Sequence, residues 1–257
     1  MFHEEVIYCE HDGQRIFGKL FRPNTEKRRV PLVIFSHELG MTHQSGLPYA
    51  QAIVNKGAAA YIFDYAGGSP ESQSDGSMLE MSAKTEARNL ACVLETAKKW
   101  EFIQPEQIVI IGGSLGGLVA TMVAHDYPHE LAGLVLLYPA YQLPEELRNM
   151  FSDRQKVPAT FTFANLFQLG RPFAEDVFDL YPYQLMQRFT KEVLILYGDQ
   201  DEAVPLPFIE KAVATFPHAA LHIIHGTGHF FPQPDKQTEA IDQILRYRRQ
   251  IHLLPEE

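Results

Sequence analysis

Cysteine and positive charge are both scarce in this sequence of 257 residues. Cys9 and Cys92 lie far apart without a metal-type spacing, which argues against a disulfide scaffold and indicates two free thiols in a reducing compartment. Lysine and arginine total 22 against 32 acidic residues, a net charge of -10. Because an acidic surface does not attract polyanions, we expect no nucleic-acid partner and no membrane partner.

Long hydrophobic runs are absent as well. No apolar run approaches the roughly 18 residues of a membrane-spanning helix. The N-terminal stretch "MFHEEVIYCEHDG" has acidic residues and lacks the apolar region of a secretory signal. These absences predict a cytoplasmic protein. The hydrophobic content of 46% is nevertheless sufficient for a full core, and it fits a single domain over residues 1–257.

Short apolar runs alternate with longer helix-like stretches over most of the chain. The apolar runs cover 30–37, 58–67, 107–113, 131–140, 192–201 and 220–226, and the helix-like stretches cover 46–57, 81–100, 115–128, 205–216 and 235–250. The apolar runs do not alternate with polar residues, as expected for a parallel sheet that is covered on both faces. The rhythm predicts an α/β fold with a mostly parallel, doubly wound sheet, preceded by a hairpin around Gly13.

Residues 141–191 interrupt this rhythm, since they hold no β-branched strand run and are rich in phenylalanine. A structureless loop of this length is uncommon in a compact domain, so we predict an inserted helical cap. The segment follows one predicted strand and precedes the next. We therefore expect the cap to lie over one edge of the sheet.

The stretch "IIGGSLGGLVA" (110–120) surrounds one serine with four glycines. The dinucleotide fingerprint needs glycines at i, i+2 and i+5, and a P-loop needs lysine after its last glycine; neither template fits. What remains is G-x-S-x-G, at Gly112, Ser114 and Gly116, between a strand-like and a helix-like run. A serine on such a turn projects from the carboxyl end of the sheet, where α/β proteins place their active sites. Ser114 is therefore the candidate nucleophile.

A serine nucleophile needs a base to remove its proton and an acid to hold that base. In this kind of fold the chain order is serine, acid, histidine. The stretches "YGDQDEAVP" and "HGTGHFF" follow Ser114 in that order, each after a predicted strand. The candidate acids there are Asp199, Asp201 and Glu202, and the candidate bases are His225 and His229. A metal site at the two histidines has no third ligand nearby in sequence, so we expect no metal and no other cofactor.

Taken together, the motifs resemble those of the α/β-hydrolases, most closely the small bacterial esterases that include the cinnamoyl (feruloyl) esterases. That family has G-x-x-D-x-x-V-P around its acid, matched from Gly198 to Pro205, and G-x-G-H around its base, matched at 226–229. The resemblance covers nearly the whole chain apart from the insert. It implies an α/β-hydrolase fold in which Asp201 is the acid and His229 is the base.

Acyl transfer also needs an oxyanion hole, usually two backbone N–H groups aimed where negative charge develops. One is expected from Leu115, the residue after the serine. In the resembling family the other comes from the third residue of a His-Gly-x loop, which implies Leu39. Two residues depart from the family pattern. Glu38 replaces the usual glycine, and Gly113 stands where many relatives have histidine, as is more typical of the peptidase branch of the fold.

The expected function is a serine hydrolase that cleaves small-molecule carboxylic esters through an acyl-enzyme on Ser114. The aromatic insert favours an aromatic or medium apolar acyl group, and the resemblance implies a hydroxycinnamate such as a feruloyl ester. The "GGSLGG" stretch leaves open a serine peptidase or acyl-aminoacyl hydrolase, and a thioesterase is a further alternative. The alternative of another class is an inactive hydrolase fold that serves as a binding module. Because relatives often form dimers, a homodimer is also possible.

Overall fold

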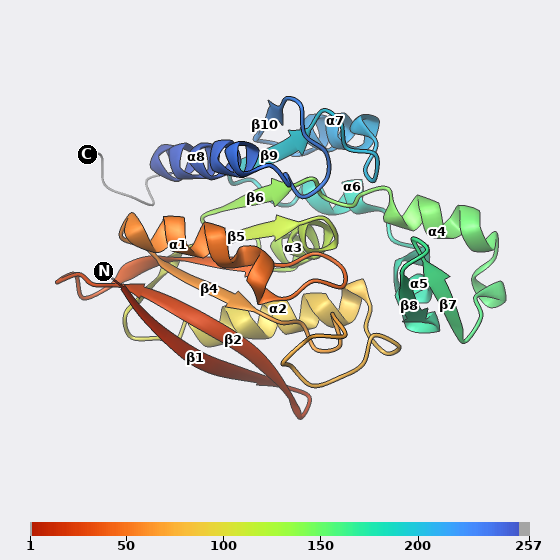
Figure 1. Cartoon of the computed structure of the whole chain (residues 1–257), viewed down its shortest axis with the longest axis horizontal. Coiled ribbons are helices and arrows are strands. Elements are labelled where there is room, and N and C mark those ends of the chain that lie inside the picture. Colours follow the sequence, from red (N-terminus) through yellow and green to blue (C-terminus); the bar gives the residue numbers. More distant parts are fainter. Residues whose placement is uncertain (1, 252–257) are drawn as a thin grey trace.

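An eight-stranded sheet forms the centre of the computed structural model, which describes residues 2–251 (Figure 1). In spatial order its strands are β1 (Phe2–His11), β2 (Gln14–Pro23), β4 (Ala59–Phe63), β3 (Val30–Ser36), β5 (Ile103–Gly113), β6 (Gly133–Leu137), β9 (Val193–Gly198) and β10 (Ala219–Ile224). The pairs β1–β2 and β2–β4 are antiparallel, and all the other pairs are parallel. This arrangement confirms the predicted α/β-hydrolase fold with a mostly parallel sheet.

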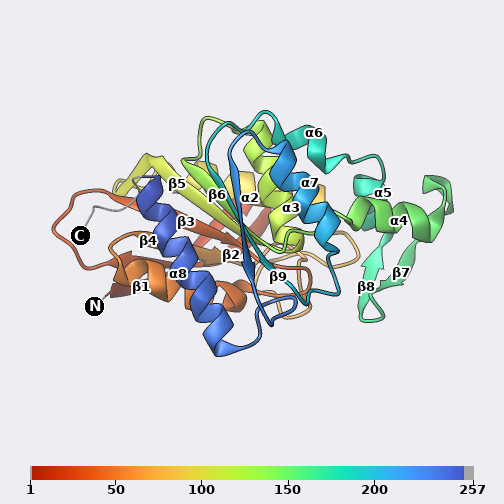
Figure 2. The same cartoon turned by 90° about the horizontal axis from the view of Figure 1, so that it is seen from above.

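Helices cover both faces of the sheet (Figure 2). One face carries α1 (Leu47–Asn55) and α8 (Pro234–Gln250), and the other carries α2 (Ala83–Ala97), α3 (Leu115–Asp126) and α7 (Leu206–Thr215). The ends of each of these helices lie within three residues of the stretch predicted for it. The sheet is therefore doubly wound, and the carboxyl ends of its parallel strands meet at one edge.

The central strands β3, β4, β6 and β9 are buried along their whole length because their alternate side chains enter two separate cores. In β3, Leu32 and Ile34 pack in the core on the α2 and α3 side. Val33 and Phe35 pack in the core on the α1 and α8 side. None of the four is more than 2% exposed. Full burial of such a side chain contributes about 1.5–3 kcal/mol to the stability of the fold. The sheet therefore holds the residues at its carboxyl edge in fixed positions.

The N-terminal hairpin turns at Asp12 and Gly13, whose φ angles are 51° and 76°. An Asp-Gly pair in the left-handed region forms the tight turn whose twist matches antiparallel strands. The pairing of β1 with β2 then runs without a bulge from His11 and Gln14 to Phe2 and Pro23. The predicted hairpin around Gly13 is therefore confirmed.

The segment between β6 and β9 projects beyond the carboxyl edge of the sheet, at the right of Figure 1. Its elements are α4 (Leu143–Phe151), the short helix η2 (Arg154–Lys156), β7 (Thr160–Phe163), β8 (Phe167–Gly170), α5 (Arg171–Phe178) and α6 (Pro182–Met186). The segment is largely helical, as predicted, but β7 and β8 form an antiparallel hairpin that the sequence analysis did not anticipate. Each strand has only four residues. The turn residues Ala164 and Asn165 have φ angles of 51° and 55° without a glycine, so the usual turn signal is missing.

Two glycines bring β8 close to the rest of the fold. A Cβ on Gly40 would lie 2.1 Å from Cε1 of Phe167, at the start of β8. A Cβ on Gly170, at its end, would lie 1.8 Å from the carbonyl oxygen of Leu79. The hairpin thus packs at one end of β8 on the loop after β3 and at the other on the loop before α2.

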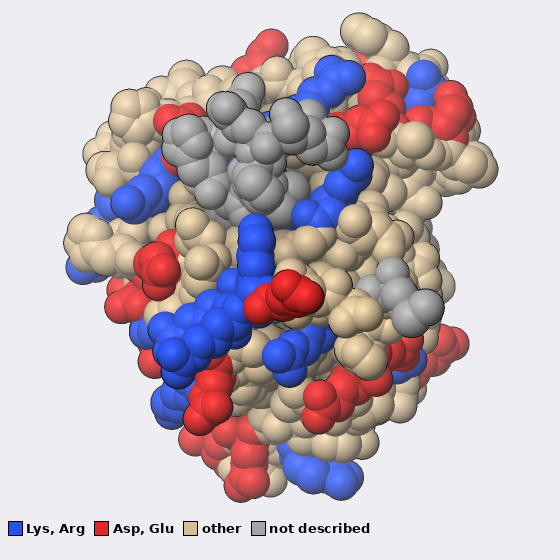
Figure 3. Space-filling model, turned by 90° about the vertical axis from the view of Figure 1, so that its left-hand side faces the viewer, with Lys and Arg blue, Asp and Glu red and all other residues tan. Residues whose placement is uncertain are grey.

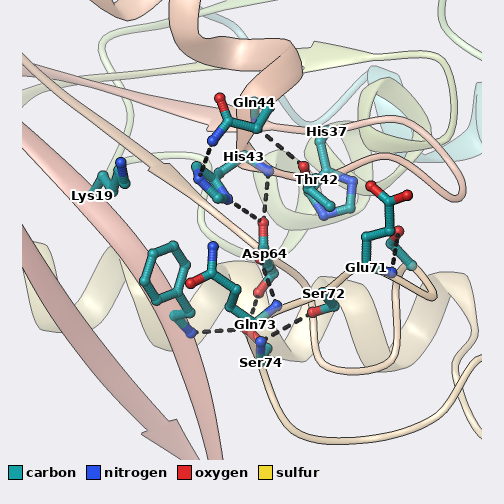
Figure 4. Close-up of polar contacts among 12 residues, drawn as sticks. Lys19, His37, Thr42, His43, Gln44, Asp64, Glu71, Ser72, Gln73 and Ser74 are labelled. Atoms are coloured by element: carbon teal, nitrogen blue, oxygen red, sulfur yellow. Dashed lines mark hydrogen bonds and ion pairs between the residues drawn. The ribbon is translucent and has the colours of Figure 1, made fainter.

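A buried polar cluster anchors the loop after β4 (Figure 4). Asp64 Oδ1 accepts hydrogen bonds from Nδ1 and the backbone N–H of His43, at 2.7 and 2.6 Å, and Oδ2 accepts one from the Gln73 N–H at 2.8 Å. Burial opposes ionisation, but these hydrogen bonds outweigh it and hold the pKa of Asp64 below its usual value. The second ring nitrogen of His43 lies 2.9 Å from the Gln44 side-chain amide, so this His–Asp pair faces no nucleophile.

The side of the molecule that lies at the left of Figure 1 mixes charges of both signs. Lysine and arginine side chains gather there in one patch, and aspartate and glutamate side chains border it (Figure 3). Among the described helices none is long and apolar enough to cross a membrane. Cys9 and Cys92 are both free thiols.

Candidate active site

Ser114 lies on the sharp turn between β5 and α3, with φ 49° and ψ -116°. This conformation is strained for a residue other than glycine and persists only where the surroundings impose it. Close packing imposes it here: a Cβ on Gly112 would lie 2.5 Å from the Gly116 carbonyl oxygen, and one on Gly116 would lie 2.2 Å from that of Ser36. The Ser114 N–H donates to the Leu137 carbonyl of β6. Gly112 and Gly116 of the G-x-S-x-G motif are therefore required because any side chain at these positions would clash with neighbouring backbone.

Three predicted residues from separate strand ends meet in one hydrogen-bonded chain. His229 Nε2 lies 3.0 Å from Ser114 Oγ, and His229 Nδ1 lies 2.8 Å from Asp201 Oδ2. The other carboxylate oxygen, Oδ1, accepts hydrogen bonds from the N–H groups of Ala203 and Val204 at 2.9 and 3.0 Å. Since Asp201 accepts at Nδ1, the imidazole carries its proton there and leaves Nε2 free to accept the serine proton.

Solvent reaches the members of this chain unequally. The Asp201 side chain is 0% exposed and that of His229 is 13% exposed. An ionised carboxylate with three donors is well solvated by the protein even though it is buried. The buried Asp201 carboxylate therefore fixes the position of the His229 imidazole, which is itself partly exposed.

The rival residues form a different contact. His225 Nδ1 lies 2.8 Å from Asp199 Oδ2, and the Gly226 N–H donates to the same carboxylate. The His225 side chain is 81% exposed. Its hydrogen bond, followed by that of Gly226, lowers the pKa of Asp199. Glu202 is exposed and lines the rim of the cavity beside the serine. Asp199, Glu202 and His225 form no hydrogen bond with Ser114, whose side chain contacts His229 instead.

The two residues expected to supply the oxyanion-hole N–H groups, Leu39 and Leu115, lie in the loop after β3 and at the start of α3. Leu115 is the first residue of α3, and the first N–H groups of a helix have no partner within it. In the loop after β3, the Glu38 carbonyl accepts hydrogen bonds from His37 Nδ1 at 2.8 Å and from the Met41 N–H at 3.1 Å. Because a trans peptide points its N–H opposite to its C=O, the Leu39 N–H faces away from those donors. Leu39, Leu115 and Ser114 line the same cavity.

The Glu38 side chain, whose direction the sequence left open, is turned into the protein. It is 3% exposed. Oε1 accepts a hydrogen bond from the Tyr138 hydroxyl at 2.9 Å, and Oε2 accepts one from Ser45 Oγ at 2.8 Å. Both carboxylate oxygens are therefore occupied by hydroxyl donors.

Tyr138 and Phe230 also belong to the site, although the sequence analysis did not select them. The His229 ring contacts both, with centroid distances of 4.4 Å to Tyr138 and 4.5 Å to Phe230, and these two rings also contact each other at 5.8 Å. Phe230 adjoins the histidine in sequence, and Tyr138 directly follows β6, so an aromatic residue at a strand end was the available signal. The imidazole is thus packed against two aromatic rings.

A cavity of about 490 Å³ opens beside Ser114 and extends under the insert. Its wall is mainly apolar and includes Met41, Leu143, Phe163, Phe167 and Phe173. Three carboxylates, Glu38, Glu146 and Glu202, are its acidic members, and burial raises the pKa of Glu146. No lysine or arginine lines this cavity in the part of the chain described. Within the same part, no group of three or more His, Cys, Asp or Glu side chains is arranged to hold a metal ion.

The fold, with a serine on the turn after its central strand, is that of the α/β-hydrolase superfamily. The sequence profile of the prolyl oligopeptidase family matches residues 47–252. The chain therefore belongs to the prolyl oligopeptidase family. This assignment lies on the peptidase side of the superfamily, toward which Gly113 had pointed.

Curated relatives are distant. The chain is 21% identical over 210 residues to the acylamino-acid-releasing enzyme of Rattus norvegicus, and the match covers 79% of this chain but only 28% of that enzyme. It is 28% identical over 168 residues to a poly(3-hydroxyalkanoate) depolymerase of Ectopseudomonas oleovorans, covering 53% of this chain and 59% of that protein.

Solved structures match over almost the whole chain. Est1E from Butyrivibrio proteoclasticus, with ferulic acid bound, superposes with a TM-score of 0.86 at 23% identity and covers 95% of this chain and 99% of its own. DcsB in complex with its substrate analogue gives 0.81 at 17% identity, covering 96% and 99%. At these identities the likeness establishes the fold.

Proposed function

We propose that this protein is a serine esterase that cleaves carboxylic esters with aromatic or medium apolar acyl groups through an acyl-enzyme on Ser114. The observation that carries the proposal is the unbroken hydrogen-bonded chain from Asp201 through His229 to Ser114, at 2.8 and 3.0 Å, at the mouth of an apolar cavity. A cavity of this size suits a small-molecule ester.

The reaction proceeds in two halves. Ser114 Oγ attacks the ester carbonyl carbon while His229 Nε2 takes the hydroxyl proton, and Asp201 stabilises the resulting imidazolium. The N–H groups of Leu39 and Leu115 hold the negative charge of the tetrahedral intermediate. His229 then protonates the departing alcohol. In the second half it activates a water molecule that releases the acid and restores the serine.

The acyl preference is argued from the cavity wall. Phe163, Phe167 and Phe173 from the insert offer flat apolar surface close to the serine. A feruloyl or cinnamoyl ester fits this wall, and the structural likeness to Est1E, whose structure holds ferulic acid, supports the same choice.

The test is hydrolysis of p-nitrophenyl butyrate and feruloyl methyl ester by the purified protein and by Ser114→Ala. We expect wild-type turnover and a loss of about three orders of magnitude or more in the variant, because the other groups cannot replace the nucleophile. Far-UV circular dichroism establishes that the variant is folded. If wild type and variant are equally inert across short and aromatic acyl esters, the protein is a binding module and the proposal fails.

An acyl-aminoacyl hydrolase is the second candidate, because the family assignment and the match to the acylamino-acid-releasing enzyme favour it. The two candidates share the same serine chemistry and differ in the bond that is cleaved. Rates on feruloyl methyl ester and on N-acetyl-aminoacyl p-nitroanilides separate them. Amide turnover that exceeds ester turnover would replace the esterase proposal by this one.

A further inference from the structure

Glu38 and Gly113, the two departures from the family pattern, occupy each other's space. A Cβ on Gly113 would lie 2.4 Å from Oε1 of Glu38 and 2.9 Å from its Cδ. The backbone of Gly113 is not in the left-handed region. Glycine is therefore needed at this position because a side chain would clash with Glu38, and not because of its backbone conformation. A buried carboxylate therefore stands directly beside the nucleophile turn, in room that a side chain at 113 would otherwise fill.

Hydroxyl groups surround this carboxylate. Tyr138 and Ser45 each donate a hydrogen bond to one of its oxygens. The Tyr49 hydroxyl is also buried and has no hydrogen-bond partner among the described residues. Burial and the Glu38 charge together raise its pKa, which places it near the same carboxylate. Among the described residues, Tyr138 is the hydroxyl donor to Glu38 whose ring also contacts the candidate base His229.

Tyr138 is held firmly at both ends. Its φ of 39° lies in the left-handed region, and its N–H donates to the Leu196 carbonyl of β9 at 2.8 Å. Its ring is 2% exposed and contacts His229 at a centroid distance of 4.4 Å, with an interplanar angle of 52°. It also meets Phe231 edge-on at 4.9 Å. The hydrogen bond to Glu38 fixes the far end of this ring.

We infer that Glu38 and Tyr138 form a positioning pair for His229, an inference that rests on the proposed function. The hydrogen bonds at Nδ1 and Nε2 fix the imidazole along one line but allow it to tilt about that line, and the Tyr138 ring blocks the tilt. A phenol that donates to a carboxylate makes a strong, charge-assisted hydrogen bond. Its ring face also favours the imidazolium formed when Ser114 loses its proton. The negative charge of Glu38, held by the hydroxyls of Tyr138 and Ser45, therefore supports the base.

The test compares Tyr138→Phe and Glu38→Gln with Tyr49→Phe as the matched control. Tyr49→Phe removes another buried tyrosine hydroxyl that is influenced by the Glu38 charge, but that hydroxyl makes no hydrogen bond to a described residue and its ring is not among those that contact His229. We expect Tyr138→Phe and Glu38→Gln to lower kcat about tenfold with KM within about twofold, and Tyr49→Phe to stay within about twofold in both. Thermal unfolding of each variant verifies that the protein is folded at the assay temperature.

The pH profile separates positioning from general packing. The titratable groups that face His229 are Asp201 and, through Tyr138, Glu38, with Glu202 at the exposed rim of the cavity. Loss of the Glu38 charge disfavours the imidazolium, so Glu38→Gln should move the acid limb of kcat/KM to lower pH by about half a unit. Unchanged kcat and acid limb in both variants would overturn the inference while leaving the esterase proposal intact. If wild type is inert, the proposed function fails, and the NMR signal of the His229 Nδ1 proton in Glu38→Gln then decides whether the ring has moved.

Discussion

Replacement of Gly113 by alanine probes directly the space that Glu38 takes up. The added methyl would lie 2.4 Å from Oε1, whereas ordinary contact begins at 3.4 Å, so one group must move by about 1 Å (3.4 - 2.4). Oε1 and Oε2 are bound by Tyr138 and Ser45, and the carboxylate cannot shift without breaking a buried hydrogen bond.

The expected cost follows from these two effects. Overpacking a buried site costs about 1–3 kcal/mol, and a broken buried hydrogen bond adds about 1–3 kcal/mol. Allowing for overlap between them, Gly113→Ala should lower the free energy of unfolding by about 2–4 kcal/mol. In the background of Glu38→Ala the carboxylate is gone, and the same methyl should be tolerated.

The assay is a double-mutant cycle measured by urea unfolding of wild type, Gly113→Ala, Glu38→Ala and the double variant. We expect a coupling free energy of about 1–3 kcal/mol in favour of the double variant. Gly57→Ala provides the control: its added Cβ meets no atom within 4 Å, and the backbone strain of alanine at its φ of 85° does not depend on Glu38, so its effect should simply add to that of Glu38→Ala. Equal destabilisation by Gly113→Ala in both backgrounds would refute the steric argument.

Two further predictions concern the acid of the proposed triad and a buried carboxyl on α2. Asp201→Asn keeps the shape of the side chain but presents an amide to His229 Nδ1, which selects the wrong tautomer; kcat for ester hydrolysis should fall by about four orders of magnitude, and a loss below tenfold would contradict the assigned role. Glu86 on α2 is 1% exposed with neither carboxyl oxygen bonded to a described residue, and burial raises its pKa well above the usual value. Because the unfolded chain ionises first as pH rises, wild-type stability should decline above about pH 4.5 by up to about 1.4 kcal/mol per pH unit until the folded pKa is reached. Glu86→Gln should lack this component in urea unfolding between pH 5 and pH 8, and parallel curves for the two proteins would show that Glu86 does not titrate in this way.

The sheet could be predicted from the sequence because strands buried on both faces consist of continuous runs of apolar residues. The runs 30–37 and 107–113 are apolar at every central position, and the structure forms β3 and β5 there. The β7–β8 hairpin left no such trace. Its strands are too short for a periodic pattern, and Ala164 and Asn165 take left-handed conformations that sequence rules assign to glycine.

The candidate site was predictable where residues sit at strand ends. Ser114, Asp201 and His229 each follow a strand, and parallel strands bring such positions to one edge, where the structure places them in hydrogen-bond contact. The direction of Glu38 was not predictable. It depends on a hydroxyl at Tyr138, 100 residues further along the chain, and no local pattern encodes a contact of that separation.

The two glycine contacts at the ends of β8 place the hairpin, and most of its cavity-lining residues take no part in them. Phe167 both meets Gly40 and lines the cavity, whereas Phe163, Ala164 and Leu166 line the cavity without touching Gly40 or Gly170. Substitutions at these last three residues leave the glycine contacts untouched. In evolutionary terms, a lineage can therefore change its substrate through single replacements in the hairpin while the scaffold that carries the serine remains under separate selection.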